Sequence, residues 1–413
     1  MLNKDGQREL CYIVQIGAIE PIEGYDRVEK AHVGGWTVLV RKDQFKEGDL
    51  GIYFEIDSKV PETEPFEFLA SKHFKIKTQK FCKGTVISQG LLMAFEDLPD
   101  HFTFFNGDWY HKDTNIAVAE VQPLTEVLGV KYSVAEDNKR KSNTSKYSAM
   151  YQRHQKLFKK NPIVKWLWKR NWGKKLLFVF LGKKRDNMYA FPSHFEYIHK
   201  TDEERVENLV PGILQDKEPW IVTEKLDGTS TTFILERKRN WYGKVEDEFY
   251  VSSRNVRQLR PDQANYHSDD SNVYWDMAIK YNIEEVLRDL LDKNPDWSYV
   301  GLQGETFGYG LQGNPNKLKD VRFFGFNLID SINGRWNSVD SMETMKPYGI
   351  EWVPIIDTNY VLPDTIEELK AQADGETVVE GGSGLREGFV YRALDGKNSF
   401  KNVSNEFLIK KGE

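Results

Sequence analysis

Short segments of alternating or continuous hydrophobic residues follow one another through the first third of the chain. Four of these segments are rich in Val, Ile, Phe and Tyr: CYIVQIGAI, WTVLVRKDQF, GDLGIYFEID and GTVISQGLLMAF. Gly, Asp and Pro separate them at short spacing, which is typical of the short strands of a small barrel or sandwich. The pattern therefore predicts a β-rich domain over residues 1–130, of a length that fits one OB-like barrel.

The second half of the chain mixes two hydrophobic periods. NIEEVLRDLLDKN and TIEELKAQAD have the apolar spacing of helices, whereas VRFFGFNLID, EGFVYRAL and EFLIK have the composition of strands. Residues 200–210 predict the start of a helix, with Thr201 as the N-cap and Glu204 as its capping-box partner. Together these segments predict a large α+β domain over residues 191–413.

The segment between the two regions differs from both in charge. The chain has a formal net charge of −6, yet residues 131–190 contain 17 Lys and Arg against three Asp and Glu. Trp166, Trp168 and Trp172 lie among these cations, an arrangement that suits a nucleic-acid strand, with cations on phosphates and rings on bases. A solvated linker ending in a helix packed on the neighbouring domain is an equal alternative, and a membrane-surface helix a weaker one.

Several classes of protein are disfavoured by the composition. The sequence has two cysteines, Cys11 and Cys82, without a CxxC pair, which argues against a disulfide scaffold and a structural zinc site. The first residues are polar, and the longest apolar run, residues 176–182, is far shorter than the roughly 20 residues of a membrane span. We therefore expect a soluble, cytoplasmic protein that has no membrane partner.

One lysine stands in a setting that suggests covalent chemistry. The stretch VTEKLDGTSTTF places Lys225 between the end of a predicted strand and a turn that contains Asp227 and Gly228. A lysine amine acts as a nucleophile when its surroundings lower its pKa from about 10.4. Because a KxDG tetrapeptide often arises by chance, the interpretation depends on the residues further along the chain.

Further residues of suitable chemistry come after Lys225 in a recognisable order. They are Arg254 in VSSRN, Glu305 in GETFGYGLQGN, Phe324 and Phe326 in FFGFN, Glu387 in REGFVY and Lys401 in SFKNVSNEFLIK. The order resembles the motif series of the covalent nucleotidyltransferases, which include DNA ligases, RNA ligases and mRNA capping enzymes. TEKLDGTSTTF, FPSHFEYIHKTDEERVENL and RVEKAHVGGWTVLVRKDQFKEGDLGIYFEIDSKVP are similar to the ATP-dependent RNA ligases with an N-terminal OB domain, RNA ligase family 5.

The resemblance implies an OB-like β-barrel followed by a nucleotidyltransferase domain, and a reaction in which Lys225 attacks the α-phosphorus of ATP. Lys225 would hold AMP as a lysyl phosphoramidate. AMP would then pass to an RNA 5′-phosphate, and a 3′-hydroxyl would displace it. The RNA partner would be a nicked duplex or a broken strand, and the protein would act as a monomer.

The resemblance also implies which residues hold metal and nucleotide. Asp227, Glu305 and Glu387 would hold a hydrated Mg²⁺ or Mn²⁺, which prefers oxygen ligands. The nucleotide contacts would be Glu224 at the adenine edge, Phe326 or alternatively Phe324 against the adenine face, Glu305 at the ribose, and Arg254 and Lys401 at phosphate oxygens.

The sequence departs from the family pattern at one position and leaves two alternatives open. Ser399 stands where the last motif often has a first lysine, so only Lys401 is in place there, with Lys410 and Lys411 further on. We expect the barrel, which carries Asp57 beside several cations, to help orient the metal–pyrophosphate group of ATP or the RNA. The alternatives are a non-catalytic RNA-binding protein of the same fold, or a DNA ligase or GTP-dependent capping enzyme. The absence of a barrel after the last motif favours RNA ligase over the latter two.

Overall fold

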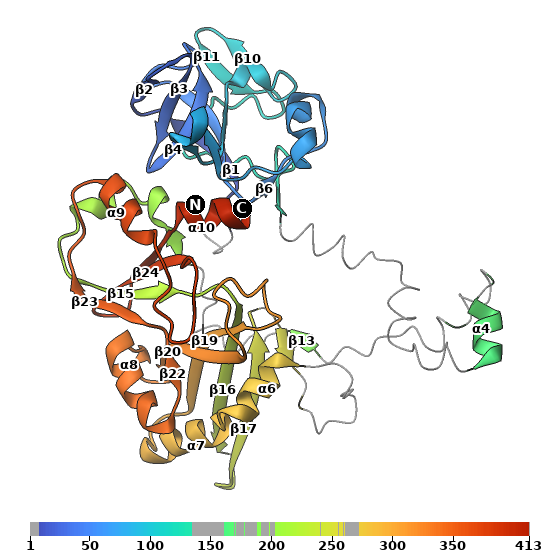
Figure 1. The fold of residues 1–413 in the computed structure, drawn as a ribbon, viewed down its shortest axis with the longest axis vertical. Coiled ribbons are helices and arrows are strands. Elements are labelled where there is room, and N and C mark those ends of the chain that lie inside the picture. Colours follow the sequence, from blue (N-terminus) through green and yellow to red (C-terminus); the bar gives the residue numbers. More distant parts are fainter. Residues whose placement is uncertain are drawn as a thin grey trace.

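The polypeptide forms an N-terminal β-barrel and a C-terminal α+β domain, as the sequence predicts (Figure 1). The computed structural model describes residues 8–133, 161–168, 203–239, 241–254, 256–258 and 272–412, together with residues 170, 177, 188–190, 198 and 260. The N-terminal domain lies at one end of the molecule, and the C-terminal helix lies next to it (Figure 1).

The N-terminal domain is built from short strands that pair in small antiparallel sheets. Its strands are β1 (Cys11–Gln15), β2 (Ile19–Ile22), β3 (Tyr25–Val33), β4 (Trp36–Arg41), β5 (Leu50–Phe54), β6 (Ser58–Lys59), β7 (Gln79–Phe81), β8 (Val86–Ser88), β9 (Leu91–Met93), β10 (Phe102–Phe105), β11 (Asp108–His111) and β12 (Lys131–Tyr132). Three 3-10 helices connect them: η1 (Glu64–Lys72), η2 (Cys82–Gly84) and η3 (Phe95–Asp97). The described sheets are β1-β5-β9, β2-β3-β4, β7-β8, β10-β11 and β12-β6.

Strand β1 explains why this domain begins with a continuous apolar run rather than with strict alternation. Successive side chains of a strand point to opposite faces. Cys11 and Ile13 contribute to one hydrophobic cluster, whereas Tyr12 and Val14 contribute to another. Because β1 is covered on both faces, both sets of positions are apolar.

The C-terminal domain contains two sheets. Its strands are β13 (Met188–Ala190), β14 (Glu204–Arg205), β15 (Trp220–Lys225), β16 (Thr229–Arg239), β17 (Val245–Ser253), β18 (Val256–Gln258), β19 (Tyr299–Gly308), β20 (Val321–Asp330), β21 (Gly334–Arg335), β22 (Glu351–Trp352), β23 (Ile355–Tyr360), β24 (Gly388–Ala393) and β25 (Ser399–Val403). The larger sheet has the order β13-β18-β17-β16-β19-β20-β21, with β22 also paired to β20. The smaller sheet has the order β14-β25-β24-β15-β23.

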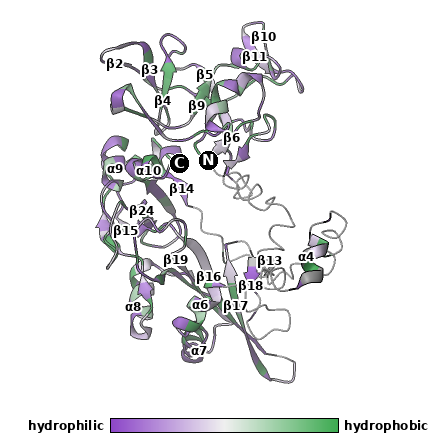
Figure 2. Cartoon of the chain, turned by 45° about the vertical axis from the view of Figure 1, so that its right-hand side comes forward, coloured by the Kyte–Doolittle hydropathy of each residue, from purple (hydrophilic) through white to green (hydrophobic). Residues whose placement is uncertain are grey.

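Helices cover the sheets of this domain. The described helices are α6 (Val273–Lys280), α7 (Ile283–Lys293), α8 (Ser338–Met345), α9 (Ile366–Ala373) and α10 (Asn405–Lys411), with 3-10 helices η5 (Val206–Asn208), η6 (Gly212–Gln215) and η7 (Lys346–Tyr348). Figure 2 shows both hydrophobic and hydrophilic residues along α7. Its buried side chains, Ile283, Val286, Leu287, Leu290 and Leu291, recur at helical spacing and pack with residues of β16, β19 and β20.

Two local predictions are wrong. Glu204 and Arg205 form β14, which runs parallel to β25, and η5 is a single turn where the sequence predicts a helix. Thr201, the expected cap, lies outside the described residues. EFLIK belongs to helix α10 rather than to a strand. Ser404 explains this outcome, because its Oγ caps the helix by accepting a hydrogen bond from the Phe407 N–H at 3.1 Å.

Asn208 joins the C-terminal domain to the barrel. Its Oδ1 accepts a hydrogen bond from Trp36 Nε1 at 2.7 Å, and its Nδ2 donates to Glu55 Oε1 at 3.0 Å. The hydroxyl of Tyr12 also donates to Glu55 Oε1, at 2.9 Å. We call Tyr12, Trp36, Glu55 and Asn208 the domain joint. Because Asn208 bonds to both Trp36 and Glu55 of the barrel, the joint fixes how the barrel sits on the C-terminal domain.

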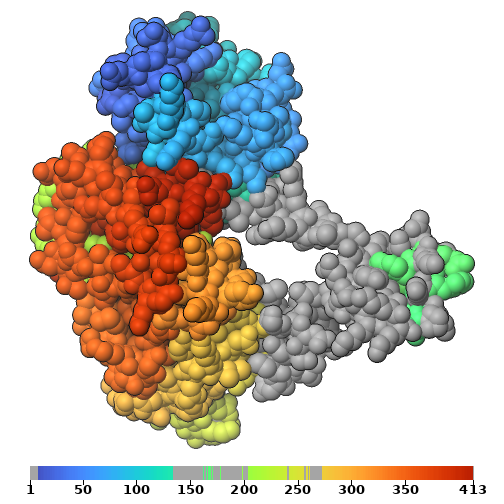
Figure 3. Space-filling model, viewed as in Figure 1, coloured from blue at the N-terminus to red at the C-terminus, as the bar shows by residue number. Residues whose placement is uncertain are grey.

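Ion pairs and apolar contacts reinforce the joint. Asp57 lies 3.1 Å from Arg8 Nη1 and 3.3 Å from Arg205 Nη2. Burial alone would raise the pKa of Asp57, but the two guanidinium groups lower it below its ordinary value. Val403 and Leu408, from the end of the chain, belong to a hydrophobic cluster of the barrel. Figure 3 shows this C-terminal segment in red against the blue surface of the barrel.

The basic segment over residues 131–190 lies mostly outside the described residues. Its described part includes helix α4 (Pro162–Trp168), in which the Trp166 side chain is half exposed. The Arg170 guanidinium lies 3.8 Å from the centroid of the Trp166 ring. Trp172 is outside the described residues, and RNA binding by this segment stays a prediction. None of the described helices has the length and apolar character needed to cross a bilayer.

The domain joint predicts the effect of Asn208→Ala. The substitution removes the acceptor of Trp36 Nε1 and a donor to Glu55, so buried polar groups lose their partners. We expect the free energy of unfolding to fall by about 2 kcal/mol in urea denaturation. Asn359→Ala, at an exposed position of β23, is the matched control and should change it by less than about 0.5 kcal/mol. Equal effects of the two variants would contradict the structural role of the joint.

The Asp57 ion pairs predict a pH-dependent contribution to stability. Because the pKa of Asp57 is lowered by folding, its stabilisation is present above the unfolded pKa, about 3.9, and is lost as the pH falls through the folded pKa. Asp57→Asn should cost about 3 kcal/mol at pH 7, and the cost should shrink at about pH 3. Urea unfolding at both pH values tests this, with exposed Asp100→Asn as control. A cost independent of pH would show that the Asp57 charge is unimportant.

Candidate active site

The site lies where the two sheets of the C-terminal domain meet. Lys225 is the last residue of β15 and pairs with Gly388 of the antiparallel strand β24. This register brings Glu387, which directly precedes Gly388, alongside the lysine. Lys225 Nζ donates a hydrogen bond to Glu387 Oε1 at 2.7 Å. Residues far apart in the sequence are therefore brought together by one strand pairing.

Glycines of the sequence motifs allow this close approach. A Cβ atom on Gly228 would lie 2.4 Å from the carbonyl oxygen of Thr306. Gly388 has a φ of +148°, and a Cβ there would lie 2.2 Å from the carbonyl oxygen of Asn402. Neighbouring backbone thus leaves no room for a side chain at Gly228 or Gly388. This explains why glycines accompany Lys225 in KxDG and Glu387 in EG.

Glu305 of β19 faces the same site from the larger sheet. Its Oε1 accepts a hydrogen bond from the Gly228 N–H at 3.1 Å. Burial is the main cause that raises the pKa of Glu305 to about 8, and the charges of Glu387 and Asp227 raise it further, against the effect of Lys225. Glu305 is therefore mostly protonated at neutral pH in this arrangement.

The carboxylates determine the protonation state of Lys225. Burial would lower the pKa of the Lys225 amine, but Glu387 above all, and then Glu305 and Asp227, raise it above its ordinary value. The amine is therefore protonated at neutral pH in this arrangement. It becomes a nucleophile only when the charge of the carboxylates is neutralised or turned away.

The three carboxylates have the chemistry of a hard-cation site but do not form a closed ligand cluster. Among the described residues, no three His, Cys, Asp or Glu side chains are arranged to hold a metal ion directly. Glu387 Oε2 is buried and has no hydrogen-bond partner. Oxygen ligands with spare acceptor capacity fit a cation that keeps several of its waters, as Mg²⁺ and Mn²⁺ do.

Phe324 and Phe326 have different environments, although residues two apart on a regular strand would share one face. Phe324 is buried and packs on Phe307, so its ring is part of the core. Strand β20 has a register irregularity at this point, because Gln303 pairs with Asn327 while Gly304 pairs with Gly325. Phe326 is the extra residue, as in a β-bulge, and is only partly buried. Of the two rings, Phe326 is the one available to a flat ligand.

Glu224 is turned away from Lys225, as expected for neighbouring residues of a strand. Its Oε1 accepts a hydrogen bond from Thr377 Oγ1 at 2.5 Å, and its Oε2 accepts one from the Val378 N–H at 2.9 Å. Burial raises the pKa of Glu224. Both carboxylate oxygens thus hold the loop at residues 377–378, and the predicted contact of Glu224 with an adenine edge stays a prediction.

The two cations predicted to contact phosphate come from other segments than Lys225 and the carboxylates. Arg254 occupies the exposed bend after β17. Lys401 lies on β25, opposite Arg205 of β14, and contributes to lowering the pKa of Asp57 in the barrel. The structure therefore brings Lys225, Asp227, Glu305 and Glu387 into one group, with Lys401 between this group and the barrel.

Three further charged residues belong to the site. Lys411 of α10 donates to Asp227 Oδ2 at 2.7 Å, so a lysine from the end of the chain reaches the KxDG turn. Arg392 lies 5.8 Å from the Phe326 ring centroid and 3.2 Å from Glu203 Oε1. Burial opposes ionisation of Glu203, yet Arg392, followed by Lys401 and Lys225, lowers its pKa. In the sequence Lys411 is only a distant candidate, and no local motif marks Glu203 or Arg392.

Comparisons with known proteins agree with this geometry. Residues 10–95 match a family model described as an OB-fold domain, and residues 218–410 match a model described as RNA ligase. No curated protein matches the chain in sequence.

Solved structures of an RNA ligase from Naegleria gruberi are similar over nearly the whole length. The structure with PPi is 27% identical, with a TM-score of 0.68, and the match covers 98% of this chain and 99% of that chain. A variant with AMP and Mn is 28% identical, with a TM-score of 0.68 and the same coverage. Another variant, with ATP and Mn, is 28% identical, with a TM-score of 0.67 and the same coverage. The chain therefore joins an N-terminal OB-fold domain to a domain of the RNA ligase family.

Proposed function

We propose that the protein is an ATP-dependent RNA ligase that joins a 3′-hydroxyl to a 5′-phosphate through a lysyl-AMP intermediate. The observation that carries the proposal is the Lys225 amine, held 2.7 Å from Glu387 beside Glu305 and Asp227. Its side chain lies at a strand end between the two sheets and is partly exposed. The RNA ligase family match and the N. gruberi structures with ATP and AMP support ATP as the substrate.

The first step is nucleotidyl transfer to Lys225. The deprotonated amine attacks the α-phosphorus of ATP and forms a P–N bond. The bond from the α-phosphorus to the bridging oxygen breaks, and pyrophosphate leaves with the electron pair. The reaction is mainly one of positioning and charge neutralisation.

Two further transfers complete the joining of RNA. An oxygen of the RNA 5′-phosphate attacks the phosphorus of lysyl-AMP, releases the Lys225 amine and forms a diphosphate linkage to AMP. The RNA 3′-hydroxyl then attacks the 5′-phosphorus, loses its proton and displaces AMP. The products are a phosphodiester and free AMP.

The carboxylates suit both proton and metal control. Glu387 is 2.7 Å from the Lys225 ammonium and is placed to receive its proton. Asp227, Glu305 and Glu387 are the residues that would hold a hydrated Mg²⁺ or Mn²⁺. When bound, the cation neutralises charge on the phosphates and on the carboxylates, which lowers the pKa of Lys225. The Mn in the N. gruberi structures supports this assignment.

The remaining predicted residues are proposed as nucleotide contacts. The partly buried ring of Phe326 would stack on the adenine, with Arg392 beside it. Glu305 would also contact the ribose. Arg254 and Lys401 would neutralise phosphate oxygens. Lys411 supplies a cation at the KxDG turn, which offsets the absence of a lysine at position 399.

The substrate and setting complete the proposal. The RNA would carry its two ends at a nick in a duplex or at a break in a strand. A monomer suffices, because Lys225, Asp227, Glu305 and Glu387 all come from one chain. The site of action would be the cytoplasm. A non-catalytic RNA-binding protein is disfavoured, because binding alone does not require an amine gathered with three carboxylates.

The assignment of the nucleophile predicts that Lys225→Arg abolishes covalent labelling by ATP. Arginine keeps the charge but is not deprotonated at ordinary pH, so it cannot attack phosphorus. The measurement is incubation with α-³²P-ATP and Mn²⁺, followed by denaturing electrophoresis. Lys217→Arg, at an exposed ion pair with Asp364, is the matched control and should label like the wild type. An AMP adduct on the Lys225→Arg protein would refute the proposal.

The carboxylate group predicts metal dependence. Excess EDTA should abolish labelling, and added Mn²⁺ should restore it. Glu387→Gln should slow labelling about 100-fold, because it removes a charge that acts on the reacting phosphate and amine. Glu367→Gln, on the exposed face of α9, should leave the rate unchanged, and circular dichroism should show both variants folded. Undiminished labelling in EDTA would argue against a metal role for these carboxylates.

A further inference from the structure

A cavity of about 420 Å³ opens on the N-terminal domain. It lies between the segment at residues 44–50, the segment at residues 94–96 that begins η3, and the hairpin β10–β11 with the subsequent residues 117–118. Its lining includes none of the residues of the candidate active site. Figure 1 places β10 and β11 at the end of the molecule remote from α7 and α8. The cavity is therefore a separate site.

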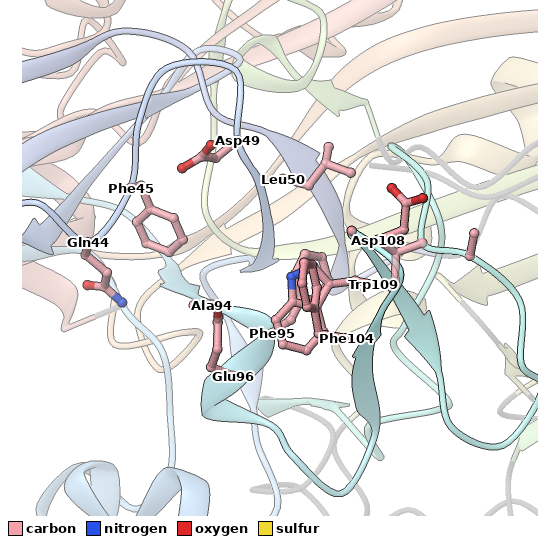
Figure 4. A pocket seen from close by; sticks show the side chains of 13 residues that line it. Gln44, Phe45, Asp49, Leu50, Ala94, Phe95, Glu96, Phe104, Asp108 and Trp109 are labelled. Atoms are coloured by element: carbon pink, nitrogen blue, oxygen red, sulfur yellow. The ribbon is translucent and has the colours of Figure 1, made fainter.

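Aromatic rings form the floor and one wall of the cavity. Phe95 and Trp109 are stacked with their centroids 5.4 Å apart, and Phe104 lies 5.3 Å from Trp109. Phe45 is buried, whereas Phe104 is 58% exposed, as is usual for a ring that lacks a covering partner. Figure 4 shows the rings of Phe95, Phe104 and Trp109 gathered together. Of these rings, Phe104 is exposed and Trp109 partly exposed, so these two are available to a ligand.

Carboxylates surround the rings. Asp49, Glu96 and Asp108 come from three different segments, and all three side chains are exposed (Figure 4). Asp49 Oδ2 accepts a hydrogen bond from the Lys46 backbone N–H at 2.8 Å. Among the residues that the structure describes, none of the three carboxylates forms an ion pair. The cavity therefore combines π faces with negative charge that the protein leaves uncompensated.

This combination selects a cation and disfavours RNA. Phosphate groups would be repelled by three carboxylates, whereas an RNA-binding face of a barrel combines aromatic rings with cations. A purely apolar side chain would leave the carboxylates unused. A guanidinium group satisfies both features, because it stacks flat on aromatic rings and donates paired hydrogen bonds to carboxylates.

We propose that this cavity binds an arginine side chain presented by a protein partner. The guanidinium group contacts Trp109 and Phe104, whose ring planes are inclined at 55°, and its N–H groups face Asp108 and Glu96. The exposed Phe104 and Phe105 of the hairpin extend the contact to apolar residues that flank the arginine. The proposal goes beyond RNA joining, because it gives the barrel a protein-docking role away from Lys225.

The test monitors Trp109 directly in the full-length protein. All tryptophans are replaced biosynthetically by 5-fluorotryptophan, and the Trp109 signal is assigned in the ¹⁹F NMR spectrum by its loss in Trp109→Phe. The probes are two capped peptides, Gly-Phe-Arg-Phe-Gly and the same peptide with citrulline in place of arginine. Citrulline keeps the shape and most hydrogen bonds of arginine without its charge. We expect the arginine peptide to shift the Trp109 signal with at least tenfold higher affinity.

Charge-matched variants separate the cavity from general electrostatics. Asp49→Asn, Glu96→Gln and Asp108→Asn are combined in one variant, and Glu47→Gln, Asp100→Asn and Asp113→Asn in another. The second set removes the same charge from exposed positions of the same domain that do not line the cavity. The first variant should lose at least tenfold in affinity for the arginine peptide, and the second should bind within twofold of the wild type. Both should keep labelling of Lys225 by ATP, since no catalytic residue is changed.

Each opposing result has a definite meaning. Equal binding of the citrulline peptide, equal loss in both variants, or no shift of Trp109 at millimolar peptide would overturn the proposal. A Trp109 shift by cytidine or adenosine without one by the arginine peptide would assign the cavity to a nucleobase instead. Concentration-dependent self-association in sedimentation velocity that only the first variant abolishes would assign it to a second copy of the chain, which also overturns the proposal.

Discussion

The pairing of β15 with β24 is the constraint on which the candidate site depends. It sets one amine beside Glu387, while the turn at Gly228 brings in Glu305 from the other sheet. The carboxylates of Glu387, Glu305 and Asp227 surround Lys225 and raise the pKa of its amine, which is therefore protonated. A divalent cation that neutralises these carboxylates would lower the pKa of the Lys225 amine and favour its reactive, deprotonated form.

The barrel packs directly against the strands of the C-terminal domain that lie near the candidate site. Asp57 is buried between Arg8 of its own domain and Arg205 of β14, the edge strand that pairs with the strand carrying Lys401. Val403 and Leu408 complete a hydrophobic cluster of the barrel. Movement of the barrel would therefore disturb β14 and β25 directly. The role of the barrel in orienting the nucleotide or the RNA stays a prediction, and Arg205 connects the barrel to the strand that carries Lys401.

The sequence predicted best those features that depend on residues close together in the chain. KxDG marks Lys225 and its turn because the glycine must lack a side chain for the backbone to approach, and hydrophobic periodicity identified both domains. What it could not show depends on long-range contacts. Glu203 and Arg392 meet only through folding, and the bulge that separates Phe326 from the core arises from the register of β19 and β20. The residues of α10 have strand-like composition, but caps at Ser404 and Gly412 stabilise them as a helix.

The domain joint has a consequence for the connectivity of the molecule. The polypeptide leaves the barrel at β12, which pairs with β6, and is next held in a sheet at β13, which pairs with β18. The groups that hold the domains together, among them Trp36, Asn208 and Arg205, lie outside the interval between these strands. These contacts between the barrel and the C-terminal domain therefore do not depend on an intact chain between β12 and β13. A protein cleaved there would keep these contacts, which favour continued association of its two parts.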